Sequence, residues 1–460
     1  MSHINVKRTR YSIAGLGKLG ASMAAAIAGR GFDVIGVDVN ASVIEAVNTG
    51  RAPVSETGLA DAIETNSARL RATAYHDEAV ARSDVTFVVV PTPSDHTGMF
   101  SLPYAIYAFR EIGRGLARKE GYHLVVLTST VMPGSTRQVL VPELEAASGK
   151  KCGCDFGVCY SPEFIALGSV IRDFLNPDFT LVGEFDERSG ATLETVYAEI
   201  LENDAPCKRM SLENAELTKL AVNTFVTTKI AYANMLAELC EVIPGGDVDV
   251  VSDALGSDKR IGRRYLTGGL GFGGPCFPRD NIALSAFGQR VGVGTDIAVT
   301  TDAANRALVR RLVEQVRAVA RPGNTVAVLG LAYKPQSHVI ERSQALEAAL
   351  AIAEAGIRVV CYDPLARSAA RNELKDKALV LDSVAACLNQ ADVVVIANPD
   401  PEFARLGPED FPLCSTPVQV IDCWRLLRAK LEGSANVRYM AIGIARDAGD
   451  ALVRLWQGAS

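Results

Sequence analysis

Residues 11–38 read YSIAGLGKLGASMAAAIAGRGFDVIGVD, and this stretch decides the fold. It begins with a short apolar run that ends in glycine, continues through an Ala-rich segment from Lys18 to about Ala28, and closes with FDVIGVD at 32–38. A strand, a helix and a second strand within about 30 residues are typical of a parallel βαβ unit. We therefore predict that the chain opens with a Rossmann-like, doubly wound α/β domain.

The turn between the first strand and the helix carries the pattern G-x-G-x-x-G, at Gly15, Gly17 and Gly20. The first glycine allows a tight turn, the second lets the backbone approach a pyrophosphate, and the third lets the helix pack closely on the strand. Asp38 follows Gly20 by 38 − 20 = 18 residues, near the spacing of about 20 at which a carboxylate binds a ribose 2′-OH. Such a carboxylate would repel a 2′-phosphate, so we predict NAD as the cofactor. The cofactor-binding candidates of this unit are Gly15, Gly17, Lys18, Leu19, Gly20 and Asp38.

The alternation of apolar runs with helical stretches continues, and we place the first domain at 1–205. Further strands are predicted within 84–93, 123–130, 155–164 and 179–185. Residues 213–241 contain neither Pro nor Gly and predict one long helix.

That helix belongs to a predicted helical region at 206–320, which ends with a second helix over 296–320. The α/β alternation then restarts, and we predict a second doubly wound domain at 321–460. Its expected strands lie within 321–335, 357–364, 391–400 and 417–424, and its first helix spans 345–356. The predicted fold is thus two Rossmann-like parallel-sheet domains joined by a long central helix.

Composition excludes several classes of protein. The 460 residues include 47 Lys and Arg against 53 Asp and Glu, a net charge of −6, and nucleic-acid binding requires a basic face. No apolar stretch reaches the roughly 18 residues of a membrane helix, and the N-terminus shows no apolar signal region. Ten scattered cysteines in such a chain are expected to be reduced thiols of a cytoplasmic protein. The spacing of Cys152, Cys154 and Cys159 lacks the paired ligands of a zinc site, so we expect no metal.

The segment GGLGFGGPCFPRD at 268–280 is the most unusual part of the sequence. Glycines dominate its first half, Pro275 and Pro278 stiffen its end, and Cys276 lies between the two prolines. A thiol on such a loop can be approached closely by a substrate, as covalent catalysis requires. From the residues alone, a structural cysteine in a turn explains the pattern equally well.

The loop nevertheless resembles the catalytic loop of the UDP-glucose/GDP-mannose dehydrogenase family, and the resemblance extends over nearly the whole chain. Several motifs in one order are more specific than any single motif. The matching segments are GLGKLG (15–20), STVMPGST (129–136), SPEF (161–164), AELTKLAVN (215–223), GFGGPCFPRD (271–280) and GLAYKP (330–335).

The resemblance implies an enzyme that oxidises the C6 alcohol of a nucleotide sugar to a carboxylate with two NAD per turnover. The first hydride transfer gives an aldehyde, a thiolate at Cys276 captures it as a thiohemiacetal, and the second gives a thioester that water hydrolyses. UDP-glucose, oxidised to UDP-glucuronate, is the first substrate to expect. The family also implies a homodimer or higher homo-oligomer formed through the central helical region, and a C-terminal domain that binds the nucleotide sugar.

The same resemblance assigns expected roles to individual residues. Lys219 and Asn223, four residues apart on one helix face, would stabilise a developing alkoxide. Asp280 and Thr130 would hold the attacking water, and Arg260 would reach a substrate across a dimer interface. The catalytic candidates are Cys276, Lys219, Asn223, Asp280, Thr130 and Glu163; Thr92 and Thr130 join the cofactor set; the substrate set is Glu163, Phe164, Lys219, Asn223, Arg260, Gly273 and Lys334.

Three positions depart from the family pattern. Leu167 replaces a glutamate that assists thioester hydrolysis in the family, Arg279 replaces the usual lysine of the cysteine loop, and Glu341–Arg342 inverts the usual order of charges after GLAYKP. These departures keep other sugars open, such as a UDP-N-acetylhexosamine or GDP-mannose. They also keep open a nucleotide-sugar-binding protein with impaired turnover.

Two other enzyme classes use similar elements. A two-electron β-hydroxyacid dehydrogenase also joins a Rossmann domain to helices, but it would need neither the Cys276 loop nor a second α/β domain. A short-chain sugar epimerase uses Tyr-x-x-x-Lys, and none of the 12 tyrosines is followed by lysine at that spacing.

Overall fold

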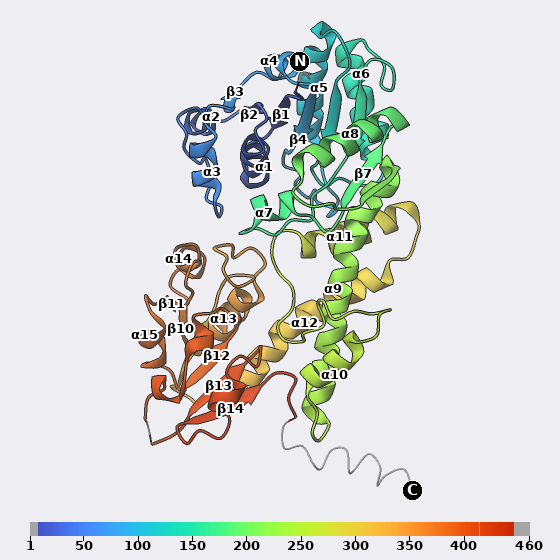
Figure 1. Cartoon of the computed structure of the whole chain (residues 1–460). Helices are drawn as coiled ribbons and strands as arrows, with labels where there is room; N and C mark the ends of the chain where they lie inside the picture. The colour runs from blue at the N-terminus through green and yellow to red at the C-terminus, as the bar shows by residue number, and fades with distance from the viewer. Residues whose placement is uncertain (1–7, 414, 446–460) are drawn as a thin grey trace. The chain divides into compact units, whose positions relative to one another are not determined.

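The computed structural model describes residues 8–413 and 415–445. The chain divides into two compact units, the first ending at Ala221 and the second beginning at Val222 (Figure 1). Each unit contains its own α/β sheet, and a helical region lies between the two sheets in the sequence. The fold class predicted from the sequence is therefore confirmed, whereas the domain boundaries at 205 and 320 stay predictions.

The first unit is built on an eight-stranded sheet with the order β3-β2-β1-β4-β5-β6-β7-β8, counted over the part of the chain that the structure describes. All neighbouring strands are parallel except β6 and β7, which are antiparallel. The order reverses between β1 and β4, and ligands of such sheets bind at the carboxyl ends of strands at this switch point. The strands are β1 (Tyr11–Ala14), β2 (Val34–Val37), β3 (Leu70–Thr73), β4 (Val85–Val88), β5 (Leu124–Leu127), β6 (Gly157–Tyr160), β7 (Thr180–Glu184) and β8 (Cys207–Ser211).

Helices cover both faces of this sheet, which is why its inner strands are mostly apolar runs. In β5, Leu124 and Val126 face a core that includes α1, whereas Val125 and Leu127 face a core formed with α5 and α6. The helices are α1 (Lys18–Gly29), α2 (Ala41–Asn48), α3 (Leu59–Thr65), α4 (His76–Arg82), α5 (Pro103–Arg118), α6 (Val141–Ser148), α7 (Val170–Leu175) and α8 (Glu187–Ile200), with one π-helical turn at Thr136–Leu140.

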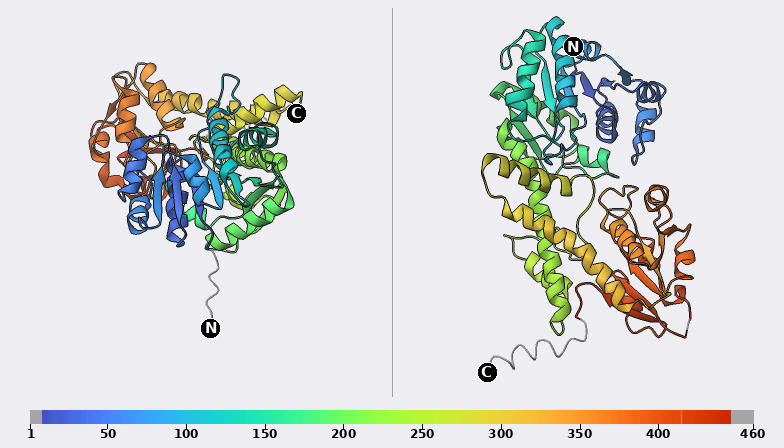
Figure 2. Two further views of the ribbon diagram at one scale, coloured as in Figure 1. Left: turned by 90° about the horizontal axis from the view of Figure 1, so that it is seen from above. Right: turned by 180° about the vertical axis from the view of Figure 1, so that it is seen from behind.

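Within its described residues, the second unit contains a six-stranded, fully parallel sheet with the order β11-β10-β9-β12-β13-β14. Helix α12 packs along α13 on one face of this sheet (Figures 1 and 2). The strands are β9 (Thr325–Leu329), β10 (Arg358–Tyr362), β11 (Leu379–Val380), β12 (Val393–Ile396), β13 (Val418–Asp422) and β14 (Val437–Ala441). The helices are α10 (Val248–Gly256), α11 (Phe277–Val291), α12 (Asp296–Val319), α13 (Gln344–Glu354), α14 (Arg367–Leu374), α15 (Val384–Leu388) and α16 (Arg428–Leu431).

Helix α9, the longest among the described residues, spans Leu212–Val242 and matches the helix predicted at 213–241. The boundary between the two compact units falls within it. Across residues 8–413 and 415–445, no helix combines the length and the apolar character that crossing a membrane demands.

The second sheet repeats the turn of the first. Gly330 follows β9 with φ +93°, as Gly15 follows β1 with φ +98°. Asp363 follows β10 as Asp38 follows β2, and the Asp363 carboxylate accepts hydrogen bonds from four backbone N–H groups. The donors are Leu331, Ala332, Leu365 and Ala366.

Candidate active site

The glycine turn after β1 has one position that is open and two that are closely packed. A Cβ at Gly15 would lie 2.2 Å from the Val89 carbonyl oxygen, and one at Gly20 would lie 1.9 Å from that of Gly15. A Cβ at Gly17 would meet no atom within 4 Å. Gly17 caps α1, whose first turn has no acidic residue and no side-chain cap. The turn therefore fits a pyrophosphate, whose charge a helix N-terminus stabilises.

Asp38 supports the same turn. Its carboxylate accepts hydrogen bonds from the backbone N–H of Leu16 at 2.8 Å and of Asn40 at 2.9 Å. A carboxylate has about four acceptor positions, so Asp38 keeps capacity for a ribose hydroxyl. The spacing of the sequence motif predicts the ribose contact but not this bracing of the glycine turn.

Thr92 and Thr130, two further cofactor candidates, are hydrogen-bonded to each other. The Thr92 hydroxyl donates to the Thr130 carbonyl oxygen at 2.7 Å. Ser129 strengthens the link, because its hydroxyl donates to the Val90 carbonyl at 2.7 Å and accepts from the Val90 N–H at 2.9 Å. The segments after β4 and β5 are thus joined beside the switch point of the first sheet.

Lys219 on α9 lies with the SPEF segment. Its ammonium donates to the Glu163 carbonyl oxygen at 2.6 Å and lies 4.5 Å from the centre of the Phe164 ring. The Lys219 side chain is buried. The structure therefore brings together Glu163, Phe164 and Lys219, which the sequence motifs assign to the site from segments more than 50 residues apart.

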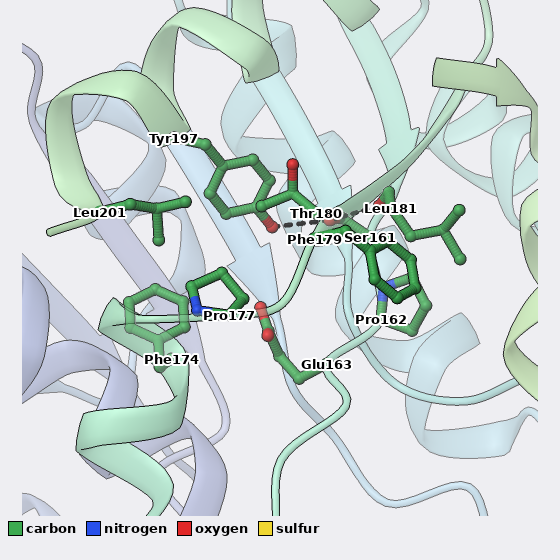
Figure 3. A pocket seen from close by; sticks show the side chains of 10 residues that line it. All are labelled: Ser161, Pro162, Glu163, Phe174, Pro177, Phe179, Thr180, Leu181, Tyr197 and Leu201. Carbon is green, nitrogen blue, oxygen red and sulfur yellow. Dashed lines mark hydrogen bonds between the residues drawn. The ribbon is translucent and has the colours of Figure 1, made fainter. Parts of the chain in front are cut away.

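The Glu163 carboxyl group points into a small buried pocket (Figure 3). The pocket has a volume of about 10 Å³, close to the room that one water molecule needs. Among its lining groups, the Ser161 and Tyr197 hydroxyls are hydrogen-bonded to each other at 2.6 Å. Burial raises the pKa of Glu163 to about 7, and the nearby Lys219 ammonium only partly opposes this shift.

This raised pKa predicts a pH-dependent stability. Between pH 4.5 and about 7 the folded state holds a proton on Glu163 that the unfolded state has lost. The free energy of unfolding must therefore fall as pH rises through this window, by roughly 3 kcal/mol, and level off above it. Urea unfolding of the parent protein and of Glu163→Gln at a series of pH values tests this. The Gln variant should lack the slope, and equal slopes in the two proteins would contradict the raised pKa.

Glu216, three residues before Lys219, is a residue that the sequence interpretation missed. It is fully buried, and its carboxylate accepts hydrogen bonds from the backbone N–H of Gly134 at 2.5 Å and of Thr136 at 2.8 Å. Glu216 thus attaches α9 to the STVMPGST segment that contains Thr130. The signal in the sequence was a carboxylate between Ala215 and Leu217 in AELTKL.

In the second unit, Cys276 occupies the N-cap of α11 and is exposed. The thiol therefore lies at the N-terminal end of a helix. One turn later, Asp280 accepts a hydrogen bond from the Asn223 side-chain amide at 2.5 Å, and both side chains are buried. The structure thus joins two more of the residues that the sequence assigns to the site.

The glycine-rich loop before Cys276 is fixed by hydrogen bonds along its length. The backbone N–H groups of Gly269, Gly271 and Phe272 donate to the side chains of Asn234, Gln344 and Asn305 at 2.7 to 2.9 Å, and that of Gly274 donates to the Glu341 carbonyl at 3.0 Å. These partners come from α9, α12, α13 and the turn after β9. The loop is therefore held rigidly against its own unit.

Gly273, a substrate-binding candidate, packs against protein. A Cβ at this position would lie 2.3 Å from the Arg342 carbonyl oxygen. The Glu341–Arg342 pair therefore contacts the cysteine loop through its main chain, which inversion of the two side chains leaves unchanged. The packing accounts for glycine at 273 without a substrate.

The second unit also contains the two remaining substrate candidates, Lys334 and Arg260. Lys334 follows β9, with its ammonium 5.8 Å from the centre of the Tyr333 ring. Arg260 lies beyond α10, with its side chain 88% exposed and paired with Asp258 at 2.6 Å. Across the residues that the structure describes, no three His, Cys, Asp or Glu side chains are grouped so that they could hold a metal ion.

Known protein families match this chain in three successive regions, which together contain the site residues described above. The NAD binding, central and UDP binding domains of the UDP-glucose/GDP-mannose dehydrogenase family match residues 9–201, 213–307 and 327–429. The chain belongs to this family. It is therefore a nucleotide-sugar dehydrogenase, NAD is its cofactor, and the glycine turn after β1 lies in its NAD-binding domain.

The curated relatives of this nucleotide-sugar dehydrogenase include proteins named UDP-glucose 6-dehydrogenase and proteins named GDP-mannose 6-dehydrogenase. It is 38% identical over 402 residues to the UDP-glucose 6-dehydrogenase AglM of Haloferax volcanii, covering 86% of this chain and 93% of that protein. It is 32% identical over 441 residues to the GDP-mannose 6-dehydrogenase of Azotobacter vinelandii, covering 93% and 99%. A solved UDP-glucose dehydrogenase from Pyrobaculum islandicum matches with a TM-score of 0.84 at 34% identity, over 97% of this chain and 99% of that one.

Proposed function

We propose that this dehydrogenase oxidises the C6 alcohol of UDP-glucose to the carboxylate of UDP-glucuronate in two successive two-electron steps. The observation that carries the proposal is the exposed thiol of Cys276 at the N-cap of α11, one turn before the hydrogen-bonded pair of Asp280 and Asn223. An enzyme that performs a single two-electron oxidation of an alcohol forms no thioester and therefore needs no such nucleophile.

When bound at the glycine turn after β1, NAD would supply the acceptor for one hydride from C6 in each oxidation. Between the two oxidations, the Cys276 sulfur bonds to the aldehyde carbon and the thiol proton ends on the carbonyl oxygen, so a thiohemiacetal forms without a change in oxidation state. Loss of a hydride from C6 and of the hydroxyl proton then leaves a thioester. Water adds to that carbon, the carbon–sulfur bond breaks, and the carboxylate and the thiol are released.

Polar groups of the chain suit the proton and charge changes of these steps. The Lys219 ammonium can stabilise the negative charge that develops on the C6 oxygen. A carboxyl group with a pKa of about 7, as at Glu163, accepts and releases protons efficiently near neutral pH. We assign water activation to Glu163, Asp280 and Thr130, because the Leu167 side chain has no polar group that could activate water.

The nucleotide is proposed from the C-terminal domain, which matches a UDP binding domain. Relatives named for GDP-mannose make that nucleotide sugar the alternative. A panel of UDP-glucose, UDP-N-acetylhexosamines and GDP-mannose, each incubated with NAD, tests the choice by NADH formation and by mass spectrometry of the product. We expect two NADH per UDP-glucose consumed. One NADH per sugar with accumulation of aldehyde would contradict the four-electron reaction, and tight binding without NADH would indicate a binding protein.

We further propose that two copies of the chain associate through α9. Large apolar side chains are exposed along α9 at spacings of three, four and seven residues, which places them on one face of the helix. They are Phe225, Tyr232, Met235, Leu239 and Val242. Water-exposed apolar faces of this kind mark interaction surfaces. The Arg260 side chain is exposed, and it would have to leave its ion pair with Asp258 to reach a second copy's substrate.

Met235→Asp should convert the dimer to a monomer, because association would bury the new charge in an apolar interface. Multi-angle light scattering at micromolar concentration measures the mass directly. Val291→Asp is the matched control, since Val291 is as exposed as Met235 but lies on α11. A parent protein that is monomeric under these conditions would refute the proposed dimer.

A further inference from the structure

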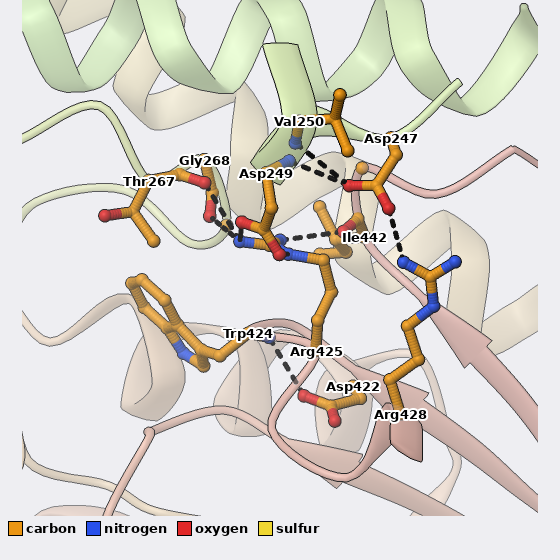
Figure 4. Close-up of polar contacts among 12 residues, drawn as sticks. Asp247, Asp249, Val250, Thr267, Gly268, Asp422, Trp424, Arg425, Arg428 and Ile442 are labelled. Atoms are coloured by element: carbon orange, nitrogen blue, oxygen red, sulfur yellow. Dashed lines mark hydrogen bonds and ion pairs between the residues drawn. The ribbon is translucent and has the colours of Figure 1, made fainter. Parts of the chain in front are cut away.

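Arg425 is a buried cation at the C-terminal sheet. It follows β13, and its side chain is 3% exposed. Its guanidinium forms a two-point ion pair with Asp249 of α10, with Nε–Oδ2 2.8 Å and Nη2–Oδ1 3.0 Å. Nη1 donates to the carbonyl oxygen of Ile442 at 2.9 Å (Figure 4).

The same guanidinium also holds the start of the cysteine loop. Nη2 donates to the carbonyl oxygens of Thr267 at 2.9 Å and Gly268 at 3.1 Å. These two residues open the glycine-rich segment that ends at Cys276. A planar guanidinium can bind a carboxylate and carbonyl groups together in one fixed geometry, whereas an ammonium is a single point of charge.

The backbone of Arg425 supports this interpretation. Its φ is +61°, in the left-handed region that residues other than glycine rarely adopt. Such a conformation persists only where surrounding contacts hold it, and it is found preferentially at functional sites. Here the contacts that hold it are the ion pair and the three carbonyl oxygens.

A neighbouring ion pair shows what the loop contact adds. Arg428 pairs with Asp247 at 2.5 Å, so it also joins the region after β13 to the start of α10. Among the described residues, its guanidinium bonds to two carboxylates, those of Asp247 and Glu432. The two arginines therefore connect the same two segments, and Arg425 differs in binding the loop carbonyls (Figure 4).

We propose that Arg425 is a positioning residue, which fixes the first residues of the cysteine loop and thereby the orientation of the Cys276 thiol. Beyond Gly268 the loop is held mainly through main-chain N–H groups, each with a fixed acceptor. A shift at Thr267–Gly268 therefore alters the register of these bonds up to Cys276. The catalytic consequence rests on the proposed function, whereas the effect on the loop does not.

Arg425→Met and the control Arg428→Met, both in the full chain, test the proposal with three measurements. Hydrogen–deuterium exchange reports the amides of 269–274. The rate of iodoacetamide alkylation at Cys276, located by peptide mapping, reports the thiol. Steady-state kinetics with UDP-glucose and a carbonyl-trapping reagent reports kcat, KM and escaped aldehyde.

For Arg425→Met we expect faster exchange in 269–274 and an altered alkylation rate. We also expect kcat for acid formation to fall roughly 10²-fold, since a misplaced catalytic group costs about that much, with trapped aldehyde and little change in KM. Arg428→Met should give values close to those of the parent protein in all three measurements. Arg425→Lys keeps the charge, so it serves if the Met variant does not fold, and it should still show the faster exchange.

Equal exchange and alkylation in the Arg425 and Arg428 variants would overturn the proposal and reduce Arg425 to a link between segments. A fall in stability without a change at 269–274 would do the same. If the parent makes no NADH from any nucleotide sugar, the proposed function fails, and exchange and alkylation still decide the role of Arg425.

Discussion

Cys276→Ser should stop formation of the carboxylate, lowering its rate by on the order of 10⁴-fold or more, as loss of a nucleophile does in other covalent enzymes. A serine hydroxyl keeps the shape of the thiol, but at neutral pH it is a far weaker nucleophile without an adjacent base. The first hydride transfer does not use the sulfur. We therefore expect the variant to produce one NADH per active site and to retain the aldehyde.

A rapid-quench experiment with mass spectrometry measures both quantities, the NADH burst and the bound aldehyde. Cys154→Ser is the matched control, because Cys154 is also an exposed cysteine but lies in the first unit outside the candidate site. The control should behave as the parent. Acid formation by Cys276→Ser at the parental rate would rule out the covalent mechanism.

Lys219→Met should lower kcat by roughly 10²- to 10³-fold, the usual cost of removing one donor to a developing oxyanion. The substitution keeps most of the aliphatic length beside Phe164 and removes the ammonium that donates to the Glu163 carbonyl. Lys219→Arg should restore little activity, because a planar guanidinium does not replace a compact ammonium in a buried position.

Steady-state NADH formation with the proposed substrate measures the effect of the Lys219 variants, and circular dichroism checks that they fold. Lys208→Met, which removes an exposed lysine on β8, is the control. A Lys219→Met variant with near-parental kcat would show that the C6 oxygen is stabilised elsewhere. An effect confined to KM would mean that Lys219 binds ground state and transition state equally.

The fold was predictable where apolar runs are long. The helix α9 covers the predicted stretch 213–241 with one more residue at each end. The strands that fall within predicted stretches are β1, β2, β4, β5, β6, β7, β9, β10, β12 and β13. The missed strands lie at sheet edges and lack such runs, as β8 with the sequence CKRMS and the two-residue β11 illustrate. The antiparallel pairing of β6 and β7 also left no trace, because direction in a sheet depends on the connection and not on composition.

The candidate site was predictable in its side chains and not in its main-chain contacts. The motifs identified Lys219, Asn223 and Asp280, and the structure joins Asn223 to Asp280 and Lys219 to the SPEF segment. The acceptor for Lys219 is a carbonyl oxygen, which exists at every residue and therefore leaves no signal in a sequence. The catalytic and binding roles of these residues stay predictions.

The repeated turn of the second sheet has a consequence for protein engineering. The Asp363 carboxylate accepts four main-chain hydrogen bonds, about as many as a carboxylate can take, so nothing is left over for a sugar diol. The turn at Asp38 thus keeps acceptor capacity for a ligand, whereas the corresponding turn at Asp363 does not. Engineering a second dinucleotide site at the Asp363 turn would first require rebuilding the backbone around Leu331 and Leu365. Side-chain substitutions near the turn would leave the main-chain hydrogen bonds to Asp363 in place.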